Sequence, residues 1–146
     1  MWEQERKLKG LKRKQVRELA FKTLFMIDIG KNCPEKALFY TLESTVFSDD
    51  ARLFLEELVL GTLEKLPELD KLLSRYLINW ELGRVSASVR TIMRLGLFEL
   101  LFLEDIPAAV TINEAIELTK RYQDEEAARF VNGVLDKIRL DVRVTK

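Results

Sequence analysis

The sequence contains no histidine and only one cysteine, and these two shortages remove most of the side-chain chemistry that enzymes use. Without histidine, a Ser-His or Cys-His nucleophile system and a histidine-containing zinc site are excluded. Cys33 has no second cysteine with which to form an internal disulfide, which favours a reducing cytoplasm. No Gly-rich loop that could cradle a phosphate precedes a helix. We therefore expect a protein that is not an enzyme and that has no metal or cofactor.

Proline and glycine are also scarce, with three and six residues among 146. Together with 47% apolar and 33% charged residues, this composition favours one compact, helix-rich domain over disorder or a turn-rich β protein. The uncharged apolar runs fall far short of the ~20 residues that span a bilayer. No hydrophobic segment with a cleavage site follows the charged N-terminus, so we expect no signal peptide.

The formal net charge is zero, but the charges are unevenly distributed along the chain. Residues 1–22 contain eight Lys or Arg against three Glu, a net charge of +5, which leaves −5 for the rest. Such asymmetry suggests an anionic partner for the basic end.

Hydrophobic periodicity predicts an all-α fold of about seven helices, and no strand-like alternation or internal repeat is found. Gly30, Pro34, the Ser48-Asp49-Asp50 cluster and Pro67 mark helix boundaries. The predicted helices cover about 11–29, 34–47, 48–66, 67–78 and 86–103, with two more in 107–138. Trp80, in the segment N-W-E-L-G-R, is interpreted as a loop anchor.

The first helix has an apolar face and an opposite side on which cations and aromatic residues alternate. Lys14, Arg17, Phe21 and Phe25 lie on or near that side. Exposed rings that stack on bases, beside cations that neutralise phosphates, are typical of a single-stranded nucleic-acid surface. Two alternatives remain open: the rings pack against another helix, or the basic end meets an acidic protein.

The helix at 86–103 is apolar nearly all round beyond Ile92, which predicts burial in the middle of a bundle. Glu99 projects toward Leu95 and Ile92, so we expect it to be paired or hydrogen-bonded. Arg90 and Arg94 are four residues apart and are interpreted as structural pairing residues.

The segment from Pro107 to Ile138 predicts two helices with a five-residue joint. Thr111 and Glu114 have the spacing of a capping box at the start of the first. In the second, an apolar stripe from Ala127 to Ile138 contains Gly133. Because a helical glycine costs roughly 1 kcal/mol relative to alanine, we expect a close contact at Gly133.

Three longer sequence segments are similar to those of a known protein family. They are L-F-E-L-L-F-L-E-D-I-P-A-A-V-T-I-N-E-A-I-E-L-T-K-R-Y, then F-V-N-G-V-L-D-K-I, with K-R-K-Q-V-R-E-L-A-F-K-T-L-F near the N-terminus. With these motifs the sequence resembles the NusB family of transcription antitermination factors over essentially its whole length.

The resemblance implies a single helical domain over 1–146 with two packed subdomains, at about 11–78 and 79–141. It implies a factor of the transcription elongation complex that binds the boxA element of ribosomal RNA operons together with NusE, a protein of the small ribosomal subunit. The positions that match RNA-binding residues are Lys12, Arg13, Lys14, Arg17 and Phe25. Those that match NusE-contacting residues are Arg90, Glu126 and Phe130.

The sequence departs from the family pattern at two places. Lys12 and Lys14 stand where the basic motif has arginines, which keeps the charge but loses bidentate phosphate geometry. Val89 stands where the family often has an acid, so the resemblance does not carry an ionic NusE contact to this position.

Other functions remain open from sequence alone. The alternatives are a non-catalytic protein-interaction module and a NusB-like RNA-binding domain in ribosomal RNA maturation. A NusB-like domain also occurs fused to ribosomal RNA cytosine methyltransferases, but no cofactor-binding domain follows here, so a free-standing factor is expected. Whether the chain is a monomer or a homodimer that hides the basic helix is left open.

Overall fold

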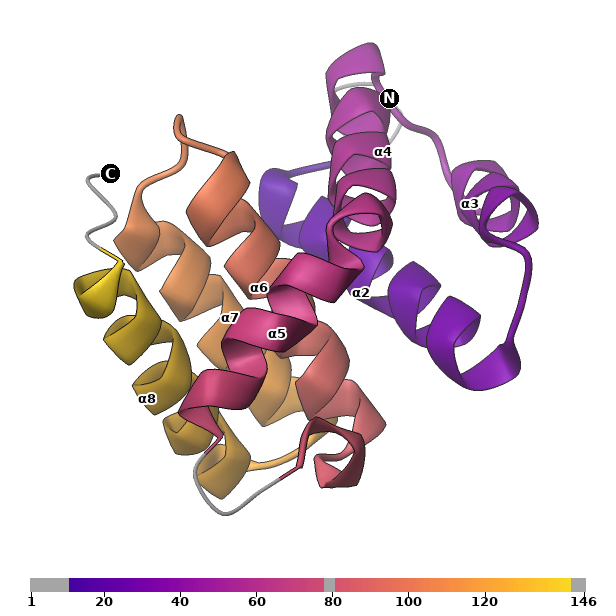
Figure 1. Ribbon diagram of the computed structural model, residues 1–146. Coiled ribbons are helices and arrows are strands. Elements are labelled where there is room, and N and C mark those ends of the chain that lie inside the picture. The colour runs from indigo at the N-terminus through magenta and orange to yellow at the C-terminus, as the bar shows by residue number, and fades with distance from the viewer. Residues whose placement is uncertain (1–10, 78–80, 143–146) are drawn as a thin grey trace. The chain divides into compact units, whose positions relative to one another are not determined.

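The computed structural model describes residues 11–77 and 81–142, and every regular element within these ranges is helical (Figure 1). Seven α-helices are present in this part of the chain, which confirms the all-α fold. They are α2 (Arg13–Gly30), α3 (Pro34–Glu43), α4 (Asp49–Glu64), α5 (Leu66–Tyr76), α6 (Ala87–Phe102), α7 (Ala108–Tyr122) and α8 (Glu125–Asp141), with one short 3-10 helix, η1 (Leu82–Arg84). Trp80, the expected loop anchor, lies outside the described residues.

Several helix boundaries follow the local signals in the sequence. Pro34 is the first residue of α3 and Pro67 the second of α5, where the missing N–H of proline costs no helical hydrogen bond. The backbone N–H of Ala51 donates to the Ser48 hydroxyl at 3.1 Å and so caps α4. Gly30 ends α2, but the residue with the left-handed conformation is Lys31, with φ 53°.

The chain divides into two compact units, residues 1–61 and 62–146. Helix α5 packs on α6 and α8 within the second unit. The subdomain division at 78/79, which the family resemblance implies, stays a prediction. In the first unit, α2 and α3 form a helical hairpin in which the hydroxyls of Thr23 and Thr41 are hydrogen-bonded.

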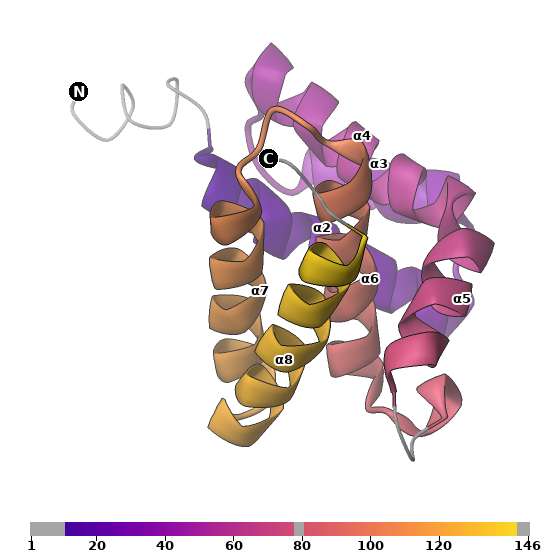
Figure 2. The same ribbon diagram turned by 60° about the vertical axis from the view of Figure 1, so that its left-hand side comes forward.

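Helix α6 is the buried centre of the second unit, as its sequence predicts. It contacts α5, α7 and α8, and Figures 1 and 2 show α6, α7 and α8 side by side. Asp70 of α5 accepts two hydrogen bonds from the Arg94 guanidinium of α6, at 2.7 and 2.8 Å. The predicted structural role of Arg94 is therefore confirmed.

Glu99 lies in the same core with 2% of its surface exposed, and the hydroxyl of Thr111 donates to its Oε1 at 3.4 Å. This confirms the expected partner for Glu99 and corrects the role of Thr111. The predicted capping box is wrong, because α7 already begins at Ala108 after Pro107 at the N-cap. Thr111 lies a turn inside the helix and its hydroxyl faces the core carboxylate.

Two further predictions about the last helices are wrong. The joint between α7 and α8 has two residues, Gln123 and Asp124, because Asp124 caps α8 by accepting from the Ala127 N–H at 2.7 Å. Gly133 is exposed, and a Cβ there would have nothing within 4 Å. The close approach is instead at Gly96 of α6, where a Cβ would lie 3.1 Å from Leu135 Cδ1.

Candidate functional site

The first candidate surface is the start of α2, where three consecutive cations lie at a helix N-terminus. Lys12 is the N-cap residue, and its backbone N–H donates to Gln15 Oε1 at 2.8 Å. The side chains of Lys12, Arg13 and Lys14 are exposed, and the first turn contains no acidic residue. A helix N-terminus carries a partial positive charge, so the helix dipole and the side chains favour an anion at the same place.

Arg17 has a different position from the one that the sequence predicts. Its side chain is only 4% exposed, so the expected open position beside Lys14 is wrong. The guanidinium carbon of Arg17 lies 5.4 Å from the ring centroid of Phe54 in α4, and that of Arg13, one turn earlier, lies 4.4 Å from it. The arginines and the ring all belong to the first unit.

The two phenylalanines of α2 also differ from each other. Phe21 is 3% exposed, so its predicted open position is wrong and the alternative, a packed ring, holds for it. Phe25 is half-buried, and its ring centroid lies 6.0 Å from that of Phe21 at an interplanar angle of 47°. Of the two rings, Phe25 alone keeps a surface that a base could contact.

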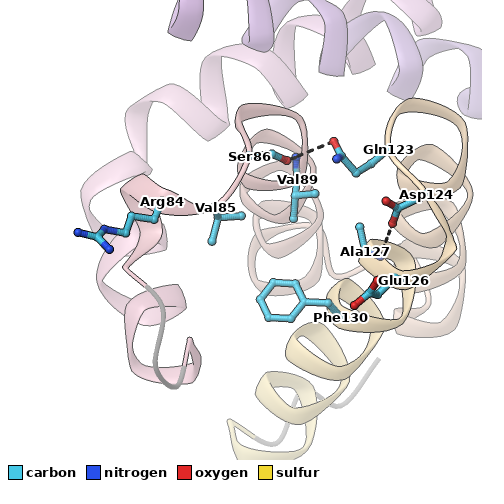
Figure 3. Close-up of a pocket in the computed structure, with 9 residues that line it drawn as sticks. All are labelled: Arg84, Val85, Ser86, Val89, Gln123, Asp124, Glu126, Ala127 and Phe130. Atoms are coloured by element: carbon cyan, nitrogen blue, oxygen red, sulfur yellow. Dashed lines mark hydrogen bonds between the residues drawn. The ribbon is translucent and has the colours of Figure 1, made fainter.

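The second candidate site is a pocket of about 360 Å³ in the second unit, between the start of α6 and the α7–α8 turn (Figure 3). Apolar side chains and two carboxylates share its lining. The lining residues are Arg84, Val85, Ser86, Val89, Gln123, Asp124, Glu126, Ala127 and Phe130.

A hydrogen bond connects the two sides of this pocket. Ser86 caps α6 by accepting from the Val89 N–H at 3.3 Å, and its hydroxyl donates to Gln123 Oε1 at 3.3 Å. Residues that are 37 positions apart in the sequence therefore meet at its rim (Figure 3).

The structure brings together two of the three residues expected to contact a protein partner. Glu126, which is exposed, and Phe130, which is half-buried, both line the pocket, as does Val89. Arg90 is not among the lining residues. Its side chain is half-buried, and Nη1 donates to the backbone carbonyl of Val85 at 3.2 Å. Arg90 therefore fixes the backbone that leads into α6.

Some residues of these sites were missed by the sequence analysis. The sequence predicts Phe54 only as an apolar position of its helix, because no local signal indicates which residue of α2 it contacts. Gln123 and Asp124 fell within the expected joint, and only the short turn places them against Ser86. Asp124 did carry a usable signal, since Asp followed by Glu-Glu is typical of a helix N-terminus.

Other site types are not found in the part of the chain that the structure describes. Across 11–77 and 81–142, no group of three or more Cys, Asp or Glu side chains is arranged to hold a metal ion. Over the same residues, no helix combines the length and the apolar character needed to cross a membrane.

Comparison with known proteins agrees with this arrangement. The model of the NusB family matches residues 14–139. The transcription antitermination protein NusB of Bacillus pumilus is 42% identical over 133 residues, which cover 91% of this chain and 98% of that protein. The structure of T. maritima NusB superposes with a TM-score of 0.83 at 39% identity, covering 88% of this chain and 91% of that one. A crystal structure of the antitermination factors NusB and NusE in complex with dsRNA superposes with a TM-score of 0.80 at 30% identity, covering 86% and 94%. The chain described here belongs to the NusB family.

Proposed function

We propose that this protein is a transcription antitermination factor that binds boxA-type RNA of ribosomal RNA operons together with NusE. The observation that carries the proposal is the match to the NusB family over residues 14–139. In this function the protein joins two partners within the transcription elongation complex and catalyses no reaction. The bacterial cytoplasm, where transcription takes place, is the compartment that this function requires.

The start of α2 is the RNA-binding surface in this proposal. The exposed side chains of Lys12, Arg13 and Lys14 neutralise phosphates, and the acid-free helix N-terminus adds to their attraction for anions. The half-buried ring of Phe25 offers a surface for base stacking farther along the helix. Arg17, at 4% exposure, supports this surface from within through Phe54.

The pocket at the α7–α8 turn is the NusE-binding site in this proposal. Phe130 and Val89 contribute apolar surface to the lining, while Glu126 and Asp124 contribute negative charge. This lining suits a protein segment with an apolar side chain beside a cation. Arg90 acts indirectly, by holding the Val85 backbone at the pocket edge.

A binding titration tests this function. Fluorescence anisotropy of a labelled boxA-type RNA is measured with this protein alone, with NusE alone and with both, over a range of salt concentrations. We expect tighter binding with both proteins. Neutralisation of three or four phosphates on a single strand gives a slope of roughly −2 to −3 in log affinity against log salt.

Two outcomes would lead to different conclusions. Absence of RNA binding even with NusE would favour a protein-interaction module whose basic end meets an acidic surface. Binding of RNA without any effect of NusE would favour a role in ribosomal RNA maturation. The solution mass, measured on the same samples, shows whether a homodimer competes with RNA for α2.

A further inference from the structure

The ring of Phe54 lies close to two guanidinium groups of α2, and no feature of the sequence around either helix indicates this contact. The guanidinium carbons of Arg13 and Arg17 lie 4.4 and 5.4 Å from the ring centroid. Phe54 itself is 7% exposed and belongs to α4, about 40 residues away in the sequence. Distances under ~6 Å are in the range of a cation–π contact.

Stacking of this kind leaves the hydrogen-bonding capacity of an arginine intact. The guanidinium is planar, and its five N–H donors point outward in the plane while a ring covers only a face. Arg13 is exposed in this structure, so the ring covers a face of its guanidinium without enclosing the side chain. A lysine at the same position would keep the charge but would have no planar group to stack.

The two arginines that contact the Phe54 ring differ in their exposure to solvent. Arg17 is 4% exposed, whereas the side chain of Arg13 is exposed. They are four residues apart and therefore lie on the same face of α2. Phe54 and Arg17 together form a buried support, and Arg13 is the one of the three whose side chain can reach a ligand.

We propose that Phe54 is a positioning residue for RNA binding, whose ring holds the Arg13 guanidinium in place for a phosphate before the RNA arrives. This inference rests on the proposed function. A long, mobile arginine loses rotamer freedom when RNA binds, and a side chain already held by a ring loses less. The charge of Arg13 attracts the phosphate, and Phe54 reduces the entropic cost of the contact.

The test is the RNA affinity of Phe54→Leu, measured by anisotropy with the full chain. We expect binding to weaken about two- to tenfold, the range for one immobilised side chain. The salt slope should stay unchanged because every charge remains, whereas Arg13→Ala should lower its magnitude by about 0.7. Phe54→Tyr and Phe54→Trp, which keep an aromatic face, should restore the affinity.

A double-mutant cycle separates positioning from general loss of structure. If Phe54 acts through Arg13, Phe54→Leu has no further effect on affinity in the Arg13→Ala background. Phe98→Leu, a core phenylalanine of α6 that is 5% exposed, is the matched control and should leave RNA affinity unchanged. Circular dichroism melts establish that each variant is folded at the assay temperature.

A second variant does not disturb the core, in case Phe54→Leu fails to fold. Arg13→Lys keeps the charge and removes both the planar stack and the bidentate phosphate geometry, and we expect weaker binding with the same salt slope. In the free protein, the Arg13 Nε–H resonance should be shifted upfield by the ring current. That shift should disappear in Phe54→Leu or in any folded variant without the ring.

The outcomes distinguish the two proposals. Failure of the wild-type protein to bind RNA even with NusE would contradict the proposed function itself. Wild-type binding that is matched by folded Phe54→Leu, or by Arg13→Lys, would overturn only the positioning role. An equal loss from Phe54→Leu with and without Arg13 would also overturn it.

Discussion

The two units of this protein carry binding surfaces that are built in different ways. In the first unit, the cations come from three consecutive residues at the start of one helix, and one of them, Arg13, stacks on a ring from α4. In the second, the pocket is assembled from the start of α6 and the α7–α8 turn. A surface of consecutive charges survives small changes in packing, whereas a pocket between helices depends on it. A substitution that weakens binding at one surface should therefore leave binding at the other unchanged.

The largest expected effect comes from removing the cations of the first surface, which should weaken RNA binding and leave NusE binding unchanged. Replacing Lys12, Arg13 and Lys14 together with alanine should weaken RNA binding roughly a hundredfold at about 0.1 M salt. The reason is that each lost phosphate contact contributes about 0.7 to the salt slope of a single strand. The slope should fall in magnitude by about 2, while NusE binding, measured by calorimetry without RNA, should stay at the wild-type value.

A matched control removes the same charge from the second unit. Lys71, Lys120 and Lys137 are exposed there, and their triple alanine variant should bind RNA with nearly wild-type affinity at 0.1 M salt or above. An equal loss in both triple variants would mean that net charge, and not the start of α2, attracts the RNA.

The next effect concerns the pocket. Phe130→Ala removes the aromatic side chain from the pocket lining and should weaken NusE binding at least tenfold, the loss typical of an aromatic hot-spot residue. RNA binding without NusE should remain unchanged. Phe102→Ala, at an α6 phenylalanine that is 37% exposed, is the control. If this control weakens NusE binding as much, the partner does not use the pocket.

A smaller effect tests the packing on which the pocket depends. Asp70→Ala removes two hydrogen bonds to Arg94 between α5 and α6, and the paired side chains are 30% and 14% exposed. We expect a loss of about 1–2 kcal/mol in unfolding free energy, between the values for exposed and buried ion pairs. Thermal melts should show a decrease of several degrees in Tm.

The control for this variant is an ion pair of the same length in a more exposed place. Asp136 and Arg139 of α8 are also 2.7 Å apart, but their side chains are 45% and 34% exposed. Asp136→Ala should therefore cost less than about 1 kcal/mol. An equal decrease in Tm for both variants would show that the Asp70–Arg94 pair contributes no more stability than an exposed ion pair.

The smallest effect compares two helical glycines. Gly133→Ala should stabilise the protein by up to about 1 kcal/mol, since the added Cβ meets nothing within 4 Å and alanine favours the helix. Gly96→Ala gains the same helix propensity, but its Cβ would lie 3.1 Å from Leu135 Cδ1. Chemical denaturation should rank Gly133→Ala above Gly96→Ala. The opposite order would place the close helix contact at Gly133.

The fold was largely predictable because helix periodicity, caps and prolines are local signals. Ser86 capping α6 and the buried course of that helix both follow from its own residues. An error arose where a side chain that is typical of a helix cap makes a tertiary contact instead. Thr111 has the sequence signature of a cap, but its hydroxyl faces the buried Glu99, and α7 begins three residues earlier.

The candidate sites were predictable to different extents. The basic stretch at the start of α2 is visible in the sequence, and the exposed positions of Lys12, Arg13 and Lys14 agree with it. For Arg17 and Phe21, periodicity gives the direction of a side chain around α2 but not what covers that side. Both are buried, at 4% and 3% exposure.

The sequence by itself determined the all-α fold, the absence of histidine chemistry and the location of the cationic stretch, because each depends on residue type and short-range spacing. Tertiary structure alone decided that Arg17 is buried, that Phe54 lies under Arg13, and that Ser86 meets Gln123 at a pocket rim. These contacts join residues far apart in the chain. Their existence depends on which helix faces pack together, and helical periodicity within one segment does not contain that information.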